Sequence, residues 1–337
     1  EYFTVPKYHF NKAAAYAFAA RFYLFYEKWE ESVKYADLCL GSEPTALLRD
    51  WADQAKMTQD PDIITEHYIS SDVKANLLLL TAYSKMGLCF GAYNYYSKYS
   101  HGNYQATNED AGALAKLFKT EMGSFYKMSP KVYSATNLDK VIFWKLPYLF
   151  EETDPVAQIG YYRAVYPAFT SDQTLLERAE AKILMKQYDS AAADMNIWLN
   201  NISKGTYNLT ADDIVNLVKD IEYSTWDAST VKKHLNPKFE LDEEGTKQEN
   251  LLQFVLLLKR VDGLQQGLRW FDIKRYGIEI ERRLIGADGL PAGFIDKLVV
   301  DDARRALQIP RKVIDAGYTP NPRGTKNGNN EKIAYTL

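Results

Sequence analysis

Apolar residues recur mainly at helical spacing along this chain. Near the N-terminus, small side chains such as Ala13, Ala17 and Ala20 lie three or four positions apart, which predicts a helix that packs closely against a neighbour. After a short break, a second helix is predicted to open with Trp29 and to end at Gly41, a residue type that commonly terminates helices.

A second pair of helices is predicted between residues 174 and 200. Thr174 and Glu177 have the spacing of a capping box at its start. This pair can be laid over the first, so that Tyr188 falls on Trp29. Small residues inside one helix and a large aromatic residue opening the next are typical of the tetratricopeptide (TPR) arrangement. The units near 11–40 and 174–200 are too far apart for a tandem solenoid, so we expect scattered helix pairs packed into one body.

The remaining segments are predicted as further helices and long loops. Residues 71–90 show an apolar stripe of helical spacing, and helices return at 250–259 and 268–276. Gly, Pro and polar residues predict loop-rich regions at 91–110, 129–172 and 201–250. The predicted fold class is therefore all-α, with TPR-like helix pairs packed into one globular body with long irregular loops. One domain is expected over residues 1–337.

Charge and hydropathy exclude two classes of partner. The 337 residues carry 41 basic and 44 acidic side chains, a formal net charge of -3, and these are mixed along the chain. Nucleic-acid binding is not expected, because it requires a one-sided basic surface. The longest apolar run is Phe254–Leu258, much shorter than the roughly 20 residues of a membrane-spanning helix. No membrane-spanning helix is therefore predicted.

The search for catalytic or metal-binding groups finds no site. The four histidines have neither HExxH nor Cys/His spacing, and there is no nucleophile elbow or phosphate-binding glycine loop. Carboxylates occur side by side at Glu151–Glu152, Asp212–Asp213 and Asp301–Asp302. A glycosidase needs two carboxyl groups facing each other, which adjacency in the sequence does not provide. We predict no catalytic residue, no metal ion and no cofactor.

Aromatic residues are abundant, and two clusters are candidates for ligand binding. The chain has 25 Tyr, 15 Phe and 6 Trp, and tyrosine suits half-exposed surfaces because its ring is apolar and its tip is polar. Both clusters join rings to polar groups, although such tyrosines can equally pack a loop onto the body or contact another protein. The first comprises Tyr93, Tyr95, Tyr96, Tyr99, Asn103 and Tyr104, and the second Tyr161, Tyr162, Arg163 and Tyr166.

Four segments resemble a known family. Gly267–Gly277 is similar to the segment E-R-W-x-D-L-K-R-W-G of SusD/RagB proteins, and Leu176–Ala181 with Tyr188–Asn196 resembles their helix pair RAEA…Y-x-x-A-x-x-D-L-N. Leu307–Asp315 is similar to the closing element IP-x-x-E-I-D-x-N. Ala13–Leu40 resembles the unit A-x-x-A-x-L-A-R-x-Y-L…W-x-x-A. Together the four segments cover under a third of the chain.

The sequence also departs from the family pattern. Leu268 stands where Glu is usual, Tyr276 where Trp is usual, and Gly317 where Asn is common. Members usually begin with a lipidated cysteine and a long further segment, which Glu1–Pro6 does not resemble, so we expect the anchor and the first helices to lie outside this chain. Within Gly267–Gly277, Trp270 and Asp272 are interpreted as scaffold residues that hold helices together.

The resemblance implies a glycan-binding lipoprotein on the outer surface of a Bacteroidetes-type outer membrane. Such proteins cap a SusC-like TonB-dependent transporter and hand it oligosaccharides without cleaving them. The matching segments are scaffold, and they transfer no ligand residue to this chain. The alternatives are a TPR-type adaptor that binds peptide or protein rather than sugar and, less favoured, a glycoside hydrolase.

Overall fold

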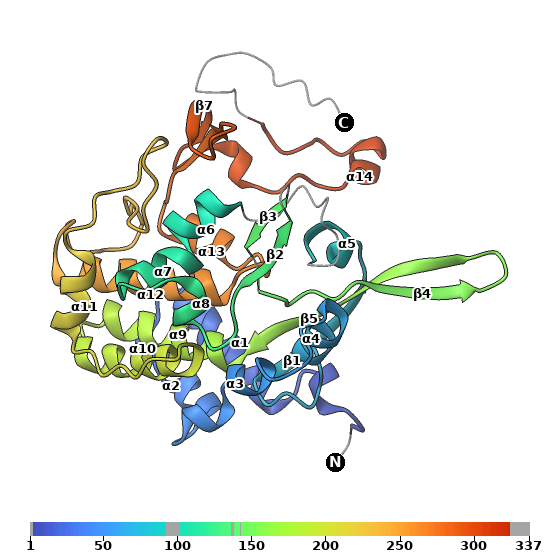
Figure 1. Cartoon of the computed structure of the whole chain (residues 1–337), viewed down its shortest axis with the longest axis horizontal. Helices are drawn as coiled ribbons and strands as arrows, with labels where there is room; N and C mark the ends of the chain where they lie inside the picture. The colour runs from blue at the N-terminus through green and yellow to red at the C-terminus, as the bar shows by residue number, and fades with distance from the viewer. Residues whose placement is uncertain (1–2, 92–101, 136–137, 142, 324–337) are drawn as a thin grey trace. The chain divides into compact units, whose positions relative to one another are not determined.

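The computed structural model describes residues 3–91, 102–135, 138–141 and 143–323. The chain forms two compact units (Figure 1). Unit 1 consists of Glu1–Asp220 and Leu241–Arg269, and unit 2 of Ile221–Glu240 and Trp270–Leu337. The single domain over residues 1–337 stays a prediction.

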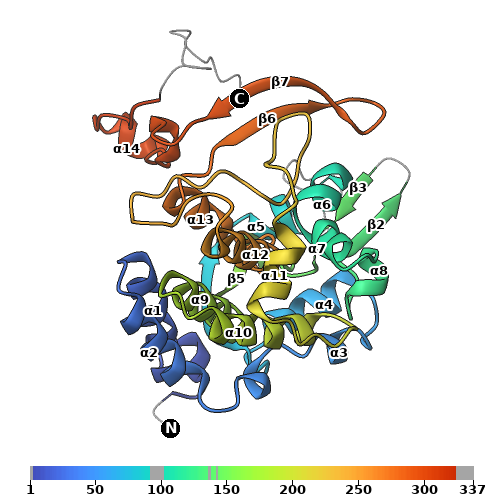
Figure 2. The same ribbon diagram turned by 90° about the vertical axis from the view of Figure 1, so that its left-hand side faces the viewer.

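Unit 1 is mainly helical, which confirms the predicted fold class. Its longest helices are α1, α2, α9, α10 and α12, and Figure 2 shows α1 and α2 beside α9 and α10. The helices are α1 (Lys12–Phe25), α2 (Trp29–Leu40), α3 (Trp51–Gln54), α4 (Pro61–Tyr68), α5 (Met86–Phe90), α6 (Asn103–Glu109), α7 (Ala111–Leu117), α8 (Met122–Phe125), α9 (Ser171–Leu184), α10 (Tyr188–Ile202), α11 (Ala211–Val218) and α12 (Lys247–Asp262), with 3-10 turns η1 (Pro6–Tyr8) and η2 (Pro44–Leu47).

The two predicted helix pairs are present and share one geometry. α1–α2 and α9–α10 superpose in sequence as expected, and the matched residues Ala20 and Ala179 are both fully buried. The turns match as well, because Glu27 and Lys186 both have left-handed backbone, with φ of 61° and 60°. Non-glycine residues rarely adopt this conformation. The correspondence therefore extends from the packed faces to the turn that sets the angle between the helices.

The start of α9 differs from the prediction. The helix begins at Ser171, and its N-cap is Thr170, whose hydroxyl accepts a hydrogen bond from the N–H of Gln173. The capping box at Thr174 was wrong: Thr174 lies inside the helix and donates its hydroxyl to the Thr170 carbonyl. Glu177 pairs with Arg21 of α1 instead, with Nε to Oε1 at 2.5 Å. Thr174 and Glu177 have the spacing of a capping box, but both lie inside helix α9.

Helix α9 is the central element of unit 1. Every residue from Ser171 to Ile183 is buried, although the segment contains five charged side chains. Arg178 binds Asp194 of α10 and Asp37 of α2, each with Nη to Oδ1 at 2.7 Å. Lys182 also reaches Asp194, and Glu180 pairs with Lys259 of α12 at 2.6 Å. Ion pairs from α9 thus reach α1, α2, α10 and α12.

Unit 1 also contains a three-stranded antiparallel sheet with strand order β1-β5-β4. The helix expected at 71–90 was wrong: residues 76–83 form an edge strand and only the end of the segment, α5, is helical. The loop expected at 129–172 was also wrong, since it contains four strands, one of them 12 residues long. The strands are β1 (Asn76–Tyr83), β2 (Lys131–Ala135), β3 (Leu138–Val141), β4 (Leu149–Asp154) and β5 (Ile159–Thr170).

A buried polar network joins the sheet to the helices. The Arg49 guanidinium lies 3.6 Å from the centre of the Tyr68 ring and donates to the Tyr68 carbonyl and to the side chain of Asn76. The Arg49 backbone N–H donates to the carboxyl group of Asp172. Burial, and next the charge of Asp262, raise the pKa of Asp172 to about 7. The network thus holds a carboxyl group that is costly to ionise.

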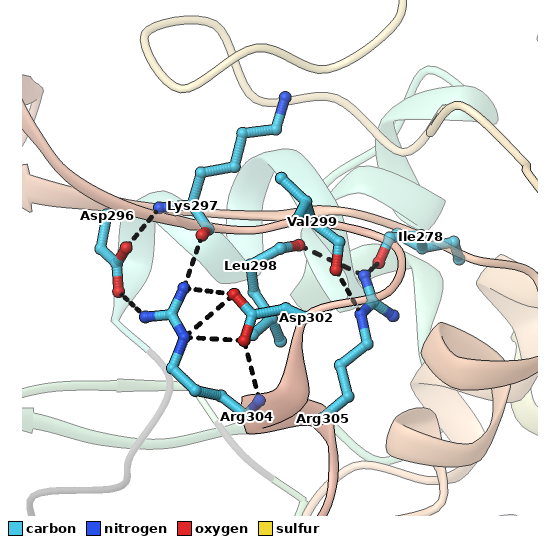
Figure 3. Close-up of polar contacts among 8 residues, drawn as sticks. All are labelled: Ile278, Asp296, Lys297, Leu298, Val299, Asp302, Arg304 and Arg305. Atoms are coloured by element: carbon cyan, nitrogen blue, oxygen red, sulfur yellow. Dashed lines mark hydrogen bonds and ion pairs between the residues drawn. The ribbon is translucent and has the colours of Figure 1, made fainter. Parts of the chain in front are cut away.

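Unit 2 contains helices α13 (Arg269–Arg275) and α14 (Arg311–Asp315), strands β6 (Ile280–Ile285) and β7 (Pro291–Leu298), and the turn η3 (Ala303–Arg305). Two arginines hold it together (Figure 3). Arg305 is buried and donates to four backbone carbonyls, two of which belong to Val299 and Ile278. Arg304 pairs with Asp296 and, with Nη2 to Oδ2 at 2.6 Å, with Asp302. These bonds tie η3 to β7.

Of the two scaffold residues predicted in Gly267–Gly277, Asp272 is buried as expected and Trp270 is not. Asp272 and Tyr276 are buried, whereas Trp270 is only half-buried and Phe271 is 48% exposed. Tyr276 takes the core position, and the Asn236 N–H donates to its carbonyl at 2.7 Å.

The ion pairs of α9 generate a stability prediction. Replacing Asp194 by Asn should lower the free energy of unfolding by about 3–5 kcal/mol, because the buried Lys182 loses its counter-charge and Arg178 keeps only Asp37. Glu31→Gln is the matched control: its pair with Lys34 is exposed, and its loss should cost at most about 0.5 kcal/mol. Urea denaturation of both variants measures the difference. Equal losses would show that the buried pairs contribute no more than a surface pair.

The raised pKa of Asp172 generates a pH prediction. The folded protein holds this proton up to about pH 7, while the unfolded chain releases it near the ordinary value of 3.8. This group's contribution to stability is therefore lost as pH rises from 4 to 7, by about 1.4 kcal/mol per unit of pKa difference. Asp172→Asn should gain stability relative to the parent protein over that range. Parallel stability curves in urea at pH 4.5 to 7.5 would contradict the assignment.

Candidate functional site

The first predicted cluster can be located only in part. Tyr93, Tyr95, Tyr96 and Tyr99 lie outside the described residues. Asn103 and Tyr104 open helix α6 rather than a loop; Asn103 is exposed and Tyr104 is half-buried. A ligand site in this segment stays a prediction.

Strand β5 divides the second predicted cluster between its two faces. Side chains alternate along a strand, so Tyr161 and Arg163 point to one side and Tyr162 and Tyr166 to the other. The sheet register adds neighbours to the first side, because Tyr83 of β1 pairs with Arg163 and Glu151 of β4 pairs with Tyr161. Tyr83, Glu151, Tyr161 and Arg163 are called the tyrosine–arginine face below. They lie on the β4–β5 hairpin and on the end of β1 that pairs with it. The hairpin extends away from the helices of unit 1 (Figure 1).

The tyrosine–arginine face is held by contacts among its own members. The rings of Tyr83 and Tyr161 meet edge to face with centroids 5.3 Å apart. The Arg163 guanidinium lies 4.2 Å from the centre of the Tyr83 ring, and its Nη2 donates to the Tyr83 hydroxyl at 3.2 Å. Arg163 also forms an ion pair with Glu151. The rings stay open to solvent, since Tyr83 is 66% exposed and Tyr161 is 54% exposed.

The opposite side of the hairpin carries a second set of rings. Tyr162 lies between Tyr148 and Phe150, at ring-centre distances of 5.9 and 5.3 Å, and the Lys85 ammonium lies 5.5 Å from its centre. Tyr162 is less exposed than Tyr161 because these neighbours surround it. This side resembles a small satellite core more than a ligand surface.

Tyr166 belongs to the scaffold. Its hydroxyl donates to the Gln266 carbonyl at 2.9 Å, and its ring packs against a buried cluster of Ala14, Leu78 and Ala168. Burial raises the pKa of Tyr166. Of the four residues in the second predicted cluster, the structure brings only Tyr161 and Arg163 together on an open surface.

In each pair of adjacent carboxylates noted in the sequence, at least one member forms an ion pair or caps a helix. Glu151 pairs with Arg163, Asp302 with Arg304, and Asp213 caps helix α11 by accepting from the Thr210 N–H and hydroxyl. Within the described ranges, no group of three or more His, Cys, Asp or Glu side chains is placed to hold a metal ion. Among the same residues, no helix has the length and apolar character needed to cross a bilayer.

The structure also shows exposed aromatic residues that sequence reasoning missed. On α1 and its C-cap residue, an exposed ridge is formed by Phe18, Phe22 and Tyr26, which are spaced four residues apart and have neighbouring ring centres at 6.0 and 5.7 Å. In unit 2, the exposed Phe294 and the half-buried Trp226 have ring centres 6.4 Å apart. The four-residue spacing of the α1 ridge is present in the sequence. It was overlooked because the alanines of the buried face dominate the pattern of the same helix.

The division of the second cluster generates a prediction. Tyr166→Ala should lower the free energy of unfolding by roughly 2–4 kcal/mol, because it leaves a cavity and removes a hydrogen bond. Tyr161→Ala should change it by no more than about 0.5 kcal/mol, because the ring is exposed. Thermal melting of the two variants distinguishes them. A larger loss for Tyr161→Ala would place that ring in the scaffold instead.

The sequence matches no family model and no curated protein, but the fold matches solved structures. A SusD superfamily protein from Bacteroides thetaiotaomicron aligns with a TM-score of 0.50 and 15% identity over 93% of this chain and 61% of its own. A SusD-like carbohydrate binding protein from Bacteroides vulgatus aligns with a TM-score of 0.47 and 14% identity, over 87% and 52%. A SusD homologue from Bacteroides thetaiotaomicron gives 0.47 and 13%, over 96% and 65%.

The chain spans less than two thirds of the length of each of these proteins. At such low identity the similarity concerns the fold, and it covers nearly all of the chain in the first alignment. It agrees with the sequence segments that resemble the SusD/RagB pattern. The chain therefore has the fold of the SusD superfamily.

Proposed function

We propose that this protein binds glycans at the cell surface and delivers them to a SusC-like TonB-dependent outer-membrane transporter. The observation that carries the proposal is the SusD superfamily fold, which extends over 93% of the chain. The exposed rings and polar groups of the β4–β5 hairpin support it further. Stacking on an aromatic ring and hydrogen bonds to hydroxyl groups are the interactions that a sugar offers.

The proposed activity is binding without cleavage. Glycoside hydrolysis requires one carboxyl group that can donate a proton and a second across the glycosidic bond. Glu151 is bound to Arg163, and the exposed Asp213 has a pKa lowered by its hydrogen bonds to Thr210, which favours the ionised form. Neither is arranged as a proton donor that faces a second carboxylate. No metal or other cofactor is part of the proposal.

The proposed location is the outer surface of the outer membrane, through a lipid anchor outside these 337 residues.

The α1 ridge of Phe18, Phe22 and Tyr26 favours an alternative in which the protein is an adaptor for peptides or proteins. Aromatic residues four positions apart on a helix suit packing against another polypeptide.

A glycan array probed with the purified chain tests the proposed function. Binding to one class of glycan is expected, with no release of reducing sugar when the bound glycan is incubated with the protein. Peptide arrays in parallel test the alternative. Binding to peptides and to no glycan would overturn the proposal in favour of the adaptor, and release of reducing sugar would show that the protein is an enzyme.

A further inference from the structure

The three strands of the sheet bring two rings, a cation and a carboxylate to one surface. Tyr83 lies directly across from Arg163, and Tyr161 lies across from Glu151, so all four side chains leave the sheet on the same side. The sequence does not show this grouping, because its members come from positions up to 80 residues apart.

The rings of this face are exposed without serving the core. The only ring contact of Tyr161 among the described residues is the edge of Tyr83, and both rings are more than half exposed. Exposing the apolar surfaces of two adjacent tyrosine rings to water is unfavourable unless another molecule covers them. The Tyr161 ring and the side of the Tyr83 ring that Arg163 does not cover are apolar surfaces of the kind on which the C–H groups of a sugar ring stack.

The charged pair has unused hydrogen-bonding capacity at the edge of the rings. Arg163 uses Nε and Nη2 for Glu151 and the Tyr83 hydroxyl, and its Nη1 has no partner within the described part of the chain. Glu151 accepts through Oε2 only, so its Oε1 is likewise unengaged by the residues that the structure describes. A donor and an acceptor fixed side by side match two neighbouring hydroxyl groups, each of which both donates and accepts.

The face is also positioned before a ligand arrives. The guanidinium is stacked on Tyr83 and bound to Glu151, so its side chain does not have to be ordered on binding. Prior ordering of this kind increases affinity, because less conformational entropy is lost in the complex.

The charge of the hairpin selects among sugars. Residues 149–163 contain Glu151, Glu152 and Asp154 but only one cation, Arg163, whose charge Glu151 compensates. A carboxylate or sulfate group on a glycan would meet net negative charge here. An uncharged sugar meets only the rings and the hydrogen-bonding groups.

We propose that Tyr83, Tyr161, Arg163 and Glu151 form a binding platform for a neutral sugar ring. The tyrosines stack on the ring, Arg163 donates to one hydroxyl group and Glu151 accepts from its neighbour. This inference rests on the proposed function and adds to it the place of binding and the class of glycan.

The experiment titrates the purified chain calorimetrically with two sets of probes. One set consists of neutral hexasaccharides of glucose, mannose, xylose and galactose, and the other of oligogalacturonates of equal length, which carry a carboxylate on each ring. At least one neutral glycan should bind and the oligogalacturonates should not. The affinity for the neutral glycan should be unchanged between 50 and 500 mM salt, because no charge pairing contributes.

Variants then place the binding. Tyr83→Ala and Tyr161→Ala should each weaken binding by about twofold to tenfold, the range for one lost aromatic contact. Tyr161→Phe should bind like the parent, since it keeps the ring. Arg163→Met and Glu151→Gln should weaken binding while the melting temperature changes little. Tyr318→Ala, which removes a tyrosine of similar exposure outside the platform, is the matched control and should bind normally.

The outcomes separate this inference from the function on which it rests. Neutral-glycan binding that survives in a folded Tyr83→Ala/Tyr161→Ala double variant would overturn the platform and leave the proposed function standing. Preferential binding of oligogalacturonates would overturn the neutral class. A chain that binds no glycan on the array or in the titrations would overturn both.

Discussion

Unit 1 depends on one constraint: its central helix is buried on every side and is nevertheless charged. An isolated ion inside a protein costs many kcal/mol, so each charge on α9 must find a partner of opposite sign. The partners come from four helices, Arg21 on α1, Asp37 on α2, Asp194 on α10 and Lys259 on α12. The ion pairs therefore determine which helix lies on which side of α9. Apolar packing alone would leave that arrangement less specified.

Close packing of small residues, a second constraint, explains why the two helix pairs share their geometry. Both pairs must present a close-packed alanine face, and both therefore turn at the same distance from it, at Glu27 and Lys186. The hydroxyl of Ser32 stands where the second pair has an alanine, and it is tolerated in the core because it donates to the Ala20 carbonyl at 2.9 Å. Fixed helices leave the sheet and its hairpin free to project, and exposed segments on a rigid support are where binding residues usually lie.

Sequence reasoning succeeded where local periodicity decides the structure and failed where long-range pairing does. The helix pairs follow from alanine spacing within each segment. Strand β1 was predicted as a helix because a short apolar run fits either period. Its pairing with β5, at partners 80 or more residues away, makes it a strand. For the candidate site, Tyr161 and Arg163 could be found from the sequence, but Tyr83 and Glu151 could not. Cross-strand register, which no single segment encodes, brings them to the same face.

This difference also explains why the segments that resemble the SusD/RagB pattern say nothing about the ligand. Leu176–Ala181 contributes Glu177, Arg178 and Glu180, all of which form ion pairs inside unit 1. A change at one of them leaves its partner's charge buried and unpaired, so the scaffold restricts their variation. The tyrosine–arginine face has no such structural role, since its members contact mainly one another and are largely exposed to solvent. Its composition can change while the fold stays the same, and chemistry at the face has to be established from its own geometry.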